Sequence, residues 1–245
     1  MRASTVKCLS ALAALALTAL PAAAQDSGWQ GQITPYVWAS GLGGDITPFT
    51  GGPTVSFDKS FSDVLEDLDG AFFLSGYARK DRFVVLGDFS YSSSSKGELT
   101  PVGPASGKLR QTSLTLAAGY RAVSNESMTL DLLGGARLWR IKGSVEAPGV
   151  GIQSSPGKSF VDPILALRAN FALAPRWSAI FYADVGGFGV GSESTSQIVA
   201  TANYQVNDNL YVSAGYRQLN VDYSDGGTRI DATMAGPLLG MTWRF

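Results

Sequence analysis

A period of two in the side-chain pattern recurs along the chain and constrains its fold more than any other feature. In residues 114–121, even positions carry Leu, Ala and Tyr, and odd positions carry Thr, Ala, Gly and Arg. This period places successive side chains on opposite faces of a β-strand. After residue 24, no stretch approaches 18 uninterrupted apolar residues, so the sequence excludes membrane-spanning helices. The alternation appears in residues 114–121, 130–139, 162–171, 177–185 and 197–204.

The less apolar face of these strands separates two β architectures. A soluble sandwich exposes a face rich in Lys, Glu and Thr, whereas a membrane barrel turns its apolar face to lipid and encloses small and polar side chains. Here the second face carries Gly and Ala beside isolated charges, and only 16% of the chain is charged, against about a quarter in soluble domains. We therefore predict an all-β fold, a transmembrane antiparallel up-and-down β-barrel. Aromatic residues at strand ends fit an interfacial girdle: Tyr120, Phe171, Trp177, Tyr204, Tyr211, Trp243 and Phe245.

The spacing of strands and connections predicts about ten strands, with eight to twelve as the range. The connections alternate between tight turns and longer segments rich in Gly, Pro and Ser, as in outer-membrane barrels. An even number places both termini on the side of the short turns, which is the periplasmic side. The predicted strands are 30–47, 70–80, 83–96, 108–122, 128–145, 158–173, 176–190, 194–206, 209–223 and 229–245. The predicted longer connections are 48–69, 97–107, 146–157, 192–193 and 224–228.

Residues 1–24 have the organisation of a cleaved signal peptide. Arg2 and Lys7 precede an apolar run at 9–20, which is shorter than the roughly 20 residues of a transmembrane helix, and three alanines then precede Gln25. The predicted mature barrel domain is 25–245. It keeps 17 basic and 20 acidic side chains, a net charge of −3, and no basic patch, so we expect no nucleic-acid partner.

The sequence contains no histidine, and its one cysteine lies in the predicted signal peptide. Catalytic systems built on imidazole or thiol, and sites that ligate metals through His or Cys, are thereby excluded. We expect no catalytic residues, no cofactor and no metal. The predicted function is that of a non-enzymatic outer-membrane barrel, structural or surface-exposed, and at most a narrow small-solute pathway. The alternatives are a lipid-modifying barrel enzyme, which the absence of His disfavours, and a soluble periplasmic β-protein.

Charged side chains fall on the face opposite the apolar one and should point into the lumen. Both signs are present, so these residues can form ion pairs that knit the strands together; the alternative is a charged constriction or ligand site. Ten strands leave little lumenal room, because eight-stranded barrels are just filled by side chains. The predicted lumenal charge network is Asp88, Arg121, Asp131, Arg137, Asp162, Arg168, Asp184 and Arg217, and Arg244 is also predicted to point inward.

One segment, 60–70, has helical rather than strand periodicity. Ser60 and Asp63 have the spacing of a capping box, apolar residues recur every three or four positions, and Gly70 can end the turn. We predict a short helix that packs its apolar side on or into the barrel mouth. Residues 58–69 are also acidic, so a divalent-cation site is the alternative, although the spacing is not that of an EF-hand.

The last residues match the C-terminal signal of bacterial outer-membrane barrels. That signal is a glycine followed by two alternating hydrophobic or aromatic residues, here Gly240, Trp243 and Phe245; the usually polar position two before the glycine is Leu238. With the stretches PYVWASG (35–41), SFSDVLEDLDG (60–70) and DVGGFGVG (184–191), the chain resembles the small proteobacterial, opacity-like outer-membrane β-barrel family.

This resemblance implies a location in the outer membrane of a Gram-negative bacterium. It implies outer-membrane lipid as the surroundings, and the barrel-insertion machinery and periplasmic chaperones as partners during biogenesis. It leaves the oligomeric state and the physiological role open, because most members of the family have no assigned activity.

Overall fold

The computed structural model describes residues 28–47, 51, 54–100, 103–147, 149, 152–154 and 157–245. The predicted signal peptide lies outside these residues. Within the described ranges, no helix is long and apolar enough to cross a membrane.

The described residues form a closed antiparallel barrel whose wall contains ten strands. Each wall strand pairs with its neighbour along the chain, and β1 closes the ring by pairing with β13 as well as β4. The ten-strand prediction is confirmed. The wall strands are β1 (Trp29–Trp38), β4 (Leu68–Lys80), β5 (Phe83–Thr100), β6 (Gly103–Ser124), β7 (Met128–Ala147), β9 (Gly157–Ala174), β10 (Trp177–Gly186), β11 (Ser194–Gln205), β12 (Leu210–Asp225) and β13 (Thr228–Arg244).

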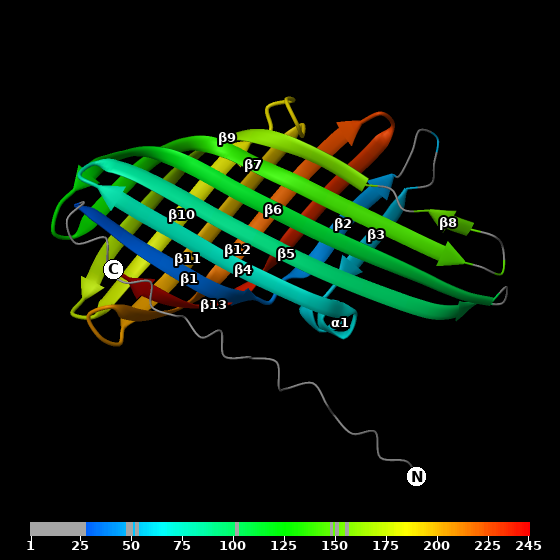
Figure 1. Ribbon diagram of the computed structural model, residues 1–245, viewed down its shortest axis with the longest axis horizontal. Helices are drawn as coiled ribbons and strands as arrows, with labels where there is room; N and C mark the ends of the chain where they lie inside the picture. The colour runs from blue at the N-terminus through cyan, green and yellow to red at the C-terminus, as the bar shows by residue number, and fades with distance from the viewer. Residues whose placement is uncertain are drawn as a thin grey trace, which may run out of the picture.

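The two ends of the barrel differ, as Figure 1 shows. Short connections of two to four residues join the strands at the left end of that view, where the C-terminus also lies. We call this the turn end. The strands β2 (Gly41–Thr47), β3 (Val55–Lys59) and β8 (Ile152–Ser154) lie at the opposite end, which we call the hairpin end.

The predicted continuous strand 30–47 is wrong, because the structure divides it between β1 and β2 at Ala39 and Ser40. β1 lies between β4 and β13, whereas β2 stays paired with β13 but has β3 on its other side. The chain therefore changes partners at this point, and the backbone leaves the regular ladder to do so. β3 itself lies in a segment predicted to be a loop.

Two other predicted loops are largely strand. β5 and β6 continue as a paired ladder through the predicted loop 97–107, and β7 runs on to Ala147, where β8 pairs with it. A hairpin satisfies its own backbone hydrogen bonds, so it can extend past the membrane without an apolar face. One predicted strand is too long instead of too short: 176–190 was predicted, and the strand ends at Gly186. Gly187, Phe188 and Gly189 follow with positive φ angles of 85°, 49° and 71°, which no strand can accommodate.

The predicted capping box is confirmed. Helix α1 (Phe61–Glu66) begins at Ser60, whose Oγ accepts a hydrogen bond from the Asp63 backbone N–H, while the Asp63 carboxylate accepts from the Ser60 N–H. The predicted packing of its apolar side is wrong, because no residue of α1 is buried and both Phe61 and Leu65 are exposed. A helix of six residues beside β2 and β3 is too short to reach across the barrel mouth.

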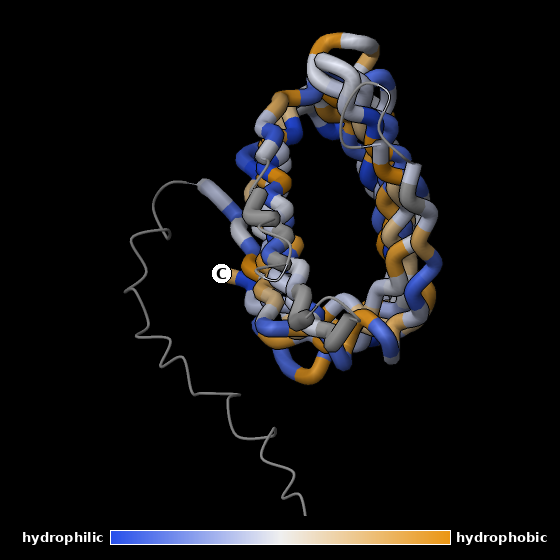
Figure 2. Tube along the Cα trace, turned by 90° about the vertical axis from the view of Figure 1, so that its right-hand side faces the viewer, coloured by the Kyte–Doolittle hydropathy of each residue, from blue (hydrophilic) through white to orange (hydrophobic). Residues whose placement is uncertain are grey.

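The wall strands expose apolar side chains outward and bury polar ones inward. Leu132 exposes 51% of its surface, while the adjacent Asp131 exposes none. On β7 the apolar outward positions run from Leu130 to Leu138, about 21 Å along the barrel axis at about 3.4 Å per residue and a tilt of about 40°. This height is close to the roughly 25 Å lipid-facing band of outer-membrane barrels. Figure 2, viewed along the barrel, shows the wall as a closed oval ring.

Two buried apolar clusters lie on the inner side of the wall. One joins Trp38, Trp139 and Phe160 to β12 and β13, and the other lines β5, β6, β7, β9 and β10 around Leu133 and Ile164. A soluble barrel would also fill its interior in this way, but it would not leave an apolar band outside. The outward band is therefore what identifies the wall as membrane-spanning.

Candidate functional site

The inward charges form separate groups at different levels of the lumen. Nearest the turn end, Asp131 accepts hydrogen bonds from Arg121 Nε and from the Tyr77 hydroxyl, each at 2.8 Å. Arg168 Nη1 lies 3.8 Å from the same carboxylate, and its guanidinium stacks over the ring of Tyr77 at 4.3 Å. The buried Asp131 carboxylate thus forms ion pairs with two arginines.

A second group lies near the middle of the lumen and joins strands from opposite parts of the sequence. Arg217 Nη2 lies 3.2 Å from Asp88 Oδ1, and the Tyr36 hydroxyl donates to Asp88 Oδ2 at 2.9 Å. Arg217 also donates to Tyr36 and to Gln197, and its guanidinium lies 4.5 Å from the ring of Trp38. This group links β1, β5, β11 and β12 across the lumen, so it holds the oval wall together.

The third group is the most deeply buried. Arg137 donates to both oxygens of Asp184, at 3.1 and 2.5 Å, and neither side chain is exposed to solvent. The hydroxyls of Thr115 and Thr195 accept further hydrogen bonds from the same guanidinium, at 3.0 and 3.1 Å. A bidentate pair with its other donors satisfied is the arrangement in which a buried ion pair offsets its desolvation cost.

Asp162, the remaining residue of the predicted network, has no ion-pair partner among the described residues. Its carboxylate instead accepts hydrogen bonds from Trp139 Nε1 at 3.0 Å and from the Ser192 backbone N–H at 2.6 Å. Arg137 is its register neighbour on β7 but turns to Asp184. All eight predicted charges therefore lie inside the wall, and seven of them take part in ion pairs.

Between these groups and the hairpin end, aromatic rings occupy the lumen. Phe160 stacks between Trp139 and Tyr223, with ring centroids 6.0 and 4.3 Å apart, and Trp38 meets Phe73 edge-on. These rings belong to the buried cluster that also contains aliphatic side chains of β12 and β13. Packed side chains therefore occupy the lumen toward the hairpin end; we call these five rings, of Trp38, Phe73, Trp139, Phe160 and Tyr223, the aromatic plug.

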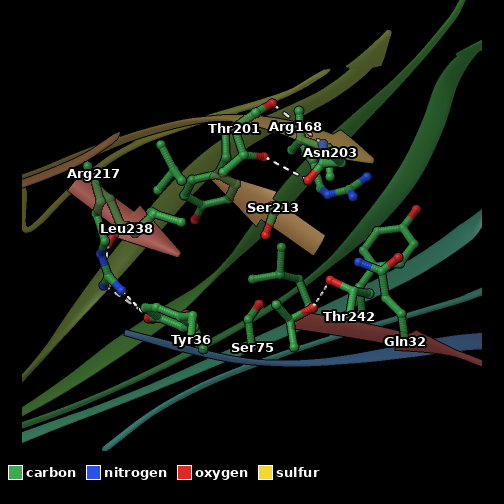
Figure 3. A pocket seen from close by; sticks show the side chains of 18 residues that line it. Gln32, Tyr36, Ser75, Arg168, Thr201, Asn203, Ser213, Arg217, Leu238 and Thr242 are labelled. Atoms are coloured by element: carbon green, nitrogen blue, oxygen red, sulfur yellow. Dashed lines mark hydrogen bonds and ion pairs between the residues drawn. The ribbon is translucent and has the colours of Figure 1, made fainter. Parts of the chain in front are cut away.

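Open space remains in the half nearer the turn end. A cavity of about 130 Å³ lies between the levels of Arg168 and Arg217, which Figure 3 shows at opposite sides of the cavity. A second cavity of about 370 Å³ adjoins the turn end and shares Gln32, Tyr77 and Arg168 with the first. Both exceed the volume of a water molecule many times over, so this half of the lumen is wet.

The residues of the predicted C-terminal signal occupy both faces of β13. Trp243 and Phe245 are exposed outward near the turn end, as a lipid-facing girdle requires. Gly240 faces inward, where an added Cβ would lie 2.7 Å from Ser213 Oγ and 3.2 Å from Thr34 Cγ2. A larger residue at this position would therefore require the side chains of Ser213 and Thr34 to move. Its recognition by the insertion machinery stays a prediction.

Several lumenal residues were missing from the sequence-based set. Tyr36 and Tyr77 bond the buried carboxylates, Gln197 bonds Arg217, and Arg79 lines the cavity at the turn end. Their positions in the two-residue alternation would have placed each of them inside. Within the described ranges, no three acidic side chains are placed to hold a metal ion.

Comparison with solved structures finds similar proteins, and one of them, OmpT, superposes well enough to show the fold. The outer membrane protease OmpT from Escherichia coli superposes with a TM-score of 0.52 at 12% identity, over 90% of this chain and 98% of that one. Ail, the attachment invasion locus protein of Yersinia pestis, has a TM-score of 0.41 at 14% identity, over 89% and 99% of the two chains. Neisserial surface protein A has a TM-score of 0.38 at 13% identity, over 89% and 98%.

No protein-family model and no curated protein matches the chain in sequence. The fold assignment rests on the closed ten-strand wall, its apolar outer band and the superposition on OmpT. The chain is a transmembrane β-barrel with the fold of bacterial outer-membrane proteins.

Proposed function

We propose that this barrel is a non-enzymatic integral protein of the Gram-negative outer membrane, with a lumen that is sealed toward the cell surface. The turn end then faces the periplasm, and the hairpins β2–β3 and β5–β6 project outside the cell. The protein acts as a structural or surface-exposed element rather than as a general diffusion pore.

The observation that carries this proposal is the seal in the hairpin half of the lumen. Arg137 and Asp184 are fully buried at its inner edge, and the aromatic plug lies above them. A hydrated solute would have to displace a bidentate ion pair and several stacked rings to cross. None of the five rings of the plug lines either of the cavities nearer the turn end.

The chemistry of the lumen supports a non-enzymatic role. The chain has no histidine, and three of the four predicted lumenal carboxylates are engaged by arginine. A carboxylate held in this way is neither a free general base nor a nucleophile. Although OmpT is a protease, its likeness to this chain at 12% identity extends to the fold alone.

Conductance in planar lipid bilayers tests the seal. The reconstituted protein should give no stable conductance, whereas a known porin in the same bilayers should give steps that scale with salt. A Phe160→Ala, Tyr223→Ala double variant removes the closest stacked pair of the plug and should conduct more than the parent, provided that it keeps the folded gel mobility. Stable, salt-proportional conductance by the parent would refute the proposal, as would hydrolysis of lipid A or peptide by the purified protein.

A further inference from the structure

The cavity of about 370 Å³ at the turn end, which we call the turn-end vestibule, is lined by four arginines from four strands. Arg79, Arg121, Arg168 and Arg244 converge on it from β4, β6, β9 and β13. Its volume is in the range of small-molecule binding pockets. Guanidinium groups that converge from separate strands are the usual protein device for holding oxyanions, because each presents several fixed N–H donors.

The carboxylates near the vestibule do not balance these arginines. Asp131 lies behind the lining and serves both Arg121 and Arg168. None of the described residues that line the vestibule has an acidic side chain. The lining therefore carries four guanidinium groups, and among the described residues Asp131 is the one carboxylate that forms ion pairs with any of them.

The hydrogen-bonding capacity of the lining is also partly unused. Arg168 is only 8% exposed, and its ion pair with Asp131, at 3.8 Å, is longer than a hydrogen bond. Buried polar atoms without a partner lie beside it in the same lining: Arg244 Nε, Thr129 Oγ1 and Asn170 Oδ1. Buried polar groups in native proteins are nearly always satisfied, so these atoms are available to water or to a ligand that enters the cavity.

The sign of that ligand follows from the charges. Four arginines line the same cavity, and like charges gathered in a partly buried site are costly unless an anion joins them. Water can solvate these groups but cannot neutralise them. An oxyanion does both, because its oxygens accept from several guanidinium groups at once.

We propose that the turn-end vestibule binds a small multivalent oxyanion of the phosphate or dicarboxylate class, entering from the turn end. Arg168 and Arg244 are its central ligands, and Thr129 and the Asn170 amide supply further donors. A half-turn of the Asn170 amide exchanges the places of its oxygen and nitrogen, so that its NH₂ group can point toward the anion. The aromatic plug prevents passage onward, so the vestibule is a binding site and not a conduit.

Equilibrium dialysis of radiolabelled inorganic phosphate against the full-length protein in neutral detergent tests this proposal at constant ionic strength in sodium chloride. The parent should bind phosphate saturably and with 1:1 stoichiometry, and phosphate should raise its unfolding temperature. Arg168→Gln and Arg244→Gln should each weaken binding by about tenfold or more, since each removes a charge-assisted hydrogen bond. Both variants should keep the heat-dependent gel mobility of a folded barrel.

Arg110→Gln is the matched control. Arg110 is an exposed arginine on the outward face of β6, opposite Lys142 in register and away from the vestibule. Arg110→Gln removes one positive charge, as the two vestibule variants do, and it should leave phosphate binding unchanged. An equal loss in all three variants would mean non-specific attraction and would overturn the proposal.

Two other outcomes would also overturn it. One is the absence of saturable phosphate binding by the parent together with no effect of phosphate on its unfolding temperature. The other is displacement of phosphate when phosphatidylglycerol is added to the micelles, which would assign the arginines to a lipid headgroup instead of a soluble anion. If Arg168→Gln fails to fold, Arg244→Gln at the rim carries the same comparison.

Discussion

Removing the carboxylate of Asp184 should destabilise the barrel more than removing any exposed charge. In Asp184→Ala, Arg137 would keep its hydrogen bonds to the hydroxyls of Thr115 and Thr195. It would lose both bonds to the carboxylate and remain fully buried with an uncompensated charge.

The magnitude follows from that burial. Breaking a buried, hydrogen-bonded pair by removing one partner costs about 3–5 kcal/mol, because the remaining charge stays desolvated. Asp225→Ala provides the comparison, since Asp225 is 68% exposed and pairs with Lys158 at 3.2 Å at the hairpin end. Exposed pairs contribute about 0–1 kcal/mol. The two variants remove the same group and should differ severalfold in effect.

Urea titration of the folded protein in lipid vesicles, followed by tryptophan fluorescence, measures both free energies of unfolding. An Arg137→Met, Asp184→Ala double variant should recover most of the loss, because replacing both partners with apolar groups removes the buried charge. The reasoning is refuted if Asp184→Ala is as stable as Asp225→Ala, or if the double variant is no better than the single one.

The other predictions concern the outer face, the closed wall and the hairpin end. Leu132→Arg should cost about 2–4 kcal/mol by placing a charge in hydrocarbon, and Gln218→Arg, outward but nearer the hairpin end, about 0–1 kcal/mol, both by urea titration in vesicles. Unboiled protein should migrate differently from boiled protein in SDS gels, because a closed wall leaves no edge to unzip; identical mobility would contradict the closed wall. Beyond the lipid band, the Lys108 ammonium at 2.8 Å, with two serine hydroxyls, lowers the pKa of Asp69 to about 2. A lowered pKa means that the contribution of Asp69 is complete above its ordinary pKa of about 4 and is lost as pH falls toward 2, so a carboxyl NMR titration should place its midpoint well below 3.

The two-residue alternation was sufficient to assign faces, because a strand allows only two directions for a side chain. It placed Asp131 inside and Leu132 outside, and the structure agrees to the residue. The same rule would have placed Arg79 and Tyr77 inside had it been applied to β4. β3 was missed although Val55 and Phe57 alternate with polar residues, because five residues give a weak signal beside an acidic helical segment.

Which inward residues meet is a different question, and the alternation cannot answer it. Arg137 and Asp162 are direct register neighbours, yet Arg137 pairs with Asp184, 47 residues away, and Asp162 takes the Trp139 indole and a backbone N–H. The choice depends on strand tilt and on how the closed wall brings distant strands to one level. Neither quantity can be read from the local pattern.

The sequence by itself determined the class of fold, the approximate number of wall strands and the two faces of each strand, because these follow from local periodicity and turn spacing. Only the tertiary structure decided that packed rings occupy one half of the lumen and that cavities remain in the other. Closure of the wall gathers bulky rings such as Phe160 and Tyr223 at the hairpin end and collects arginines such as Arg168 and Arg244 around the turn-end vestibule. Those residues lie far apart along the chain, so their grouping exists only once β13 has paired with β1.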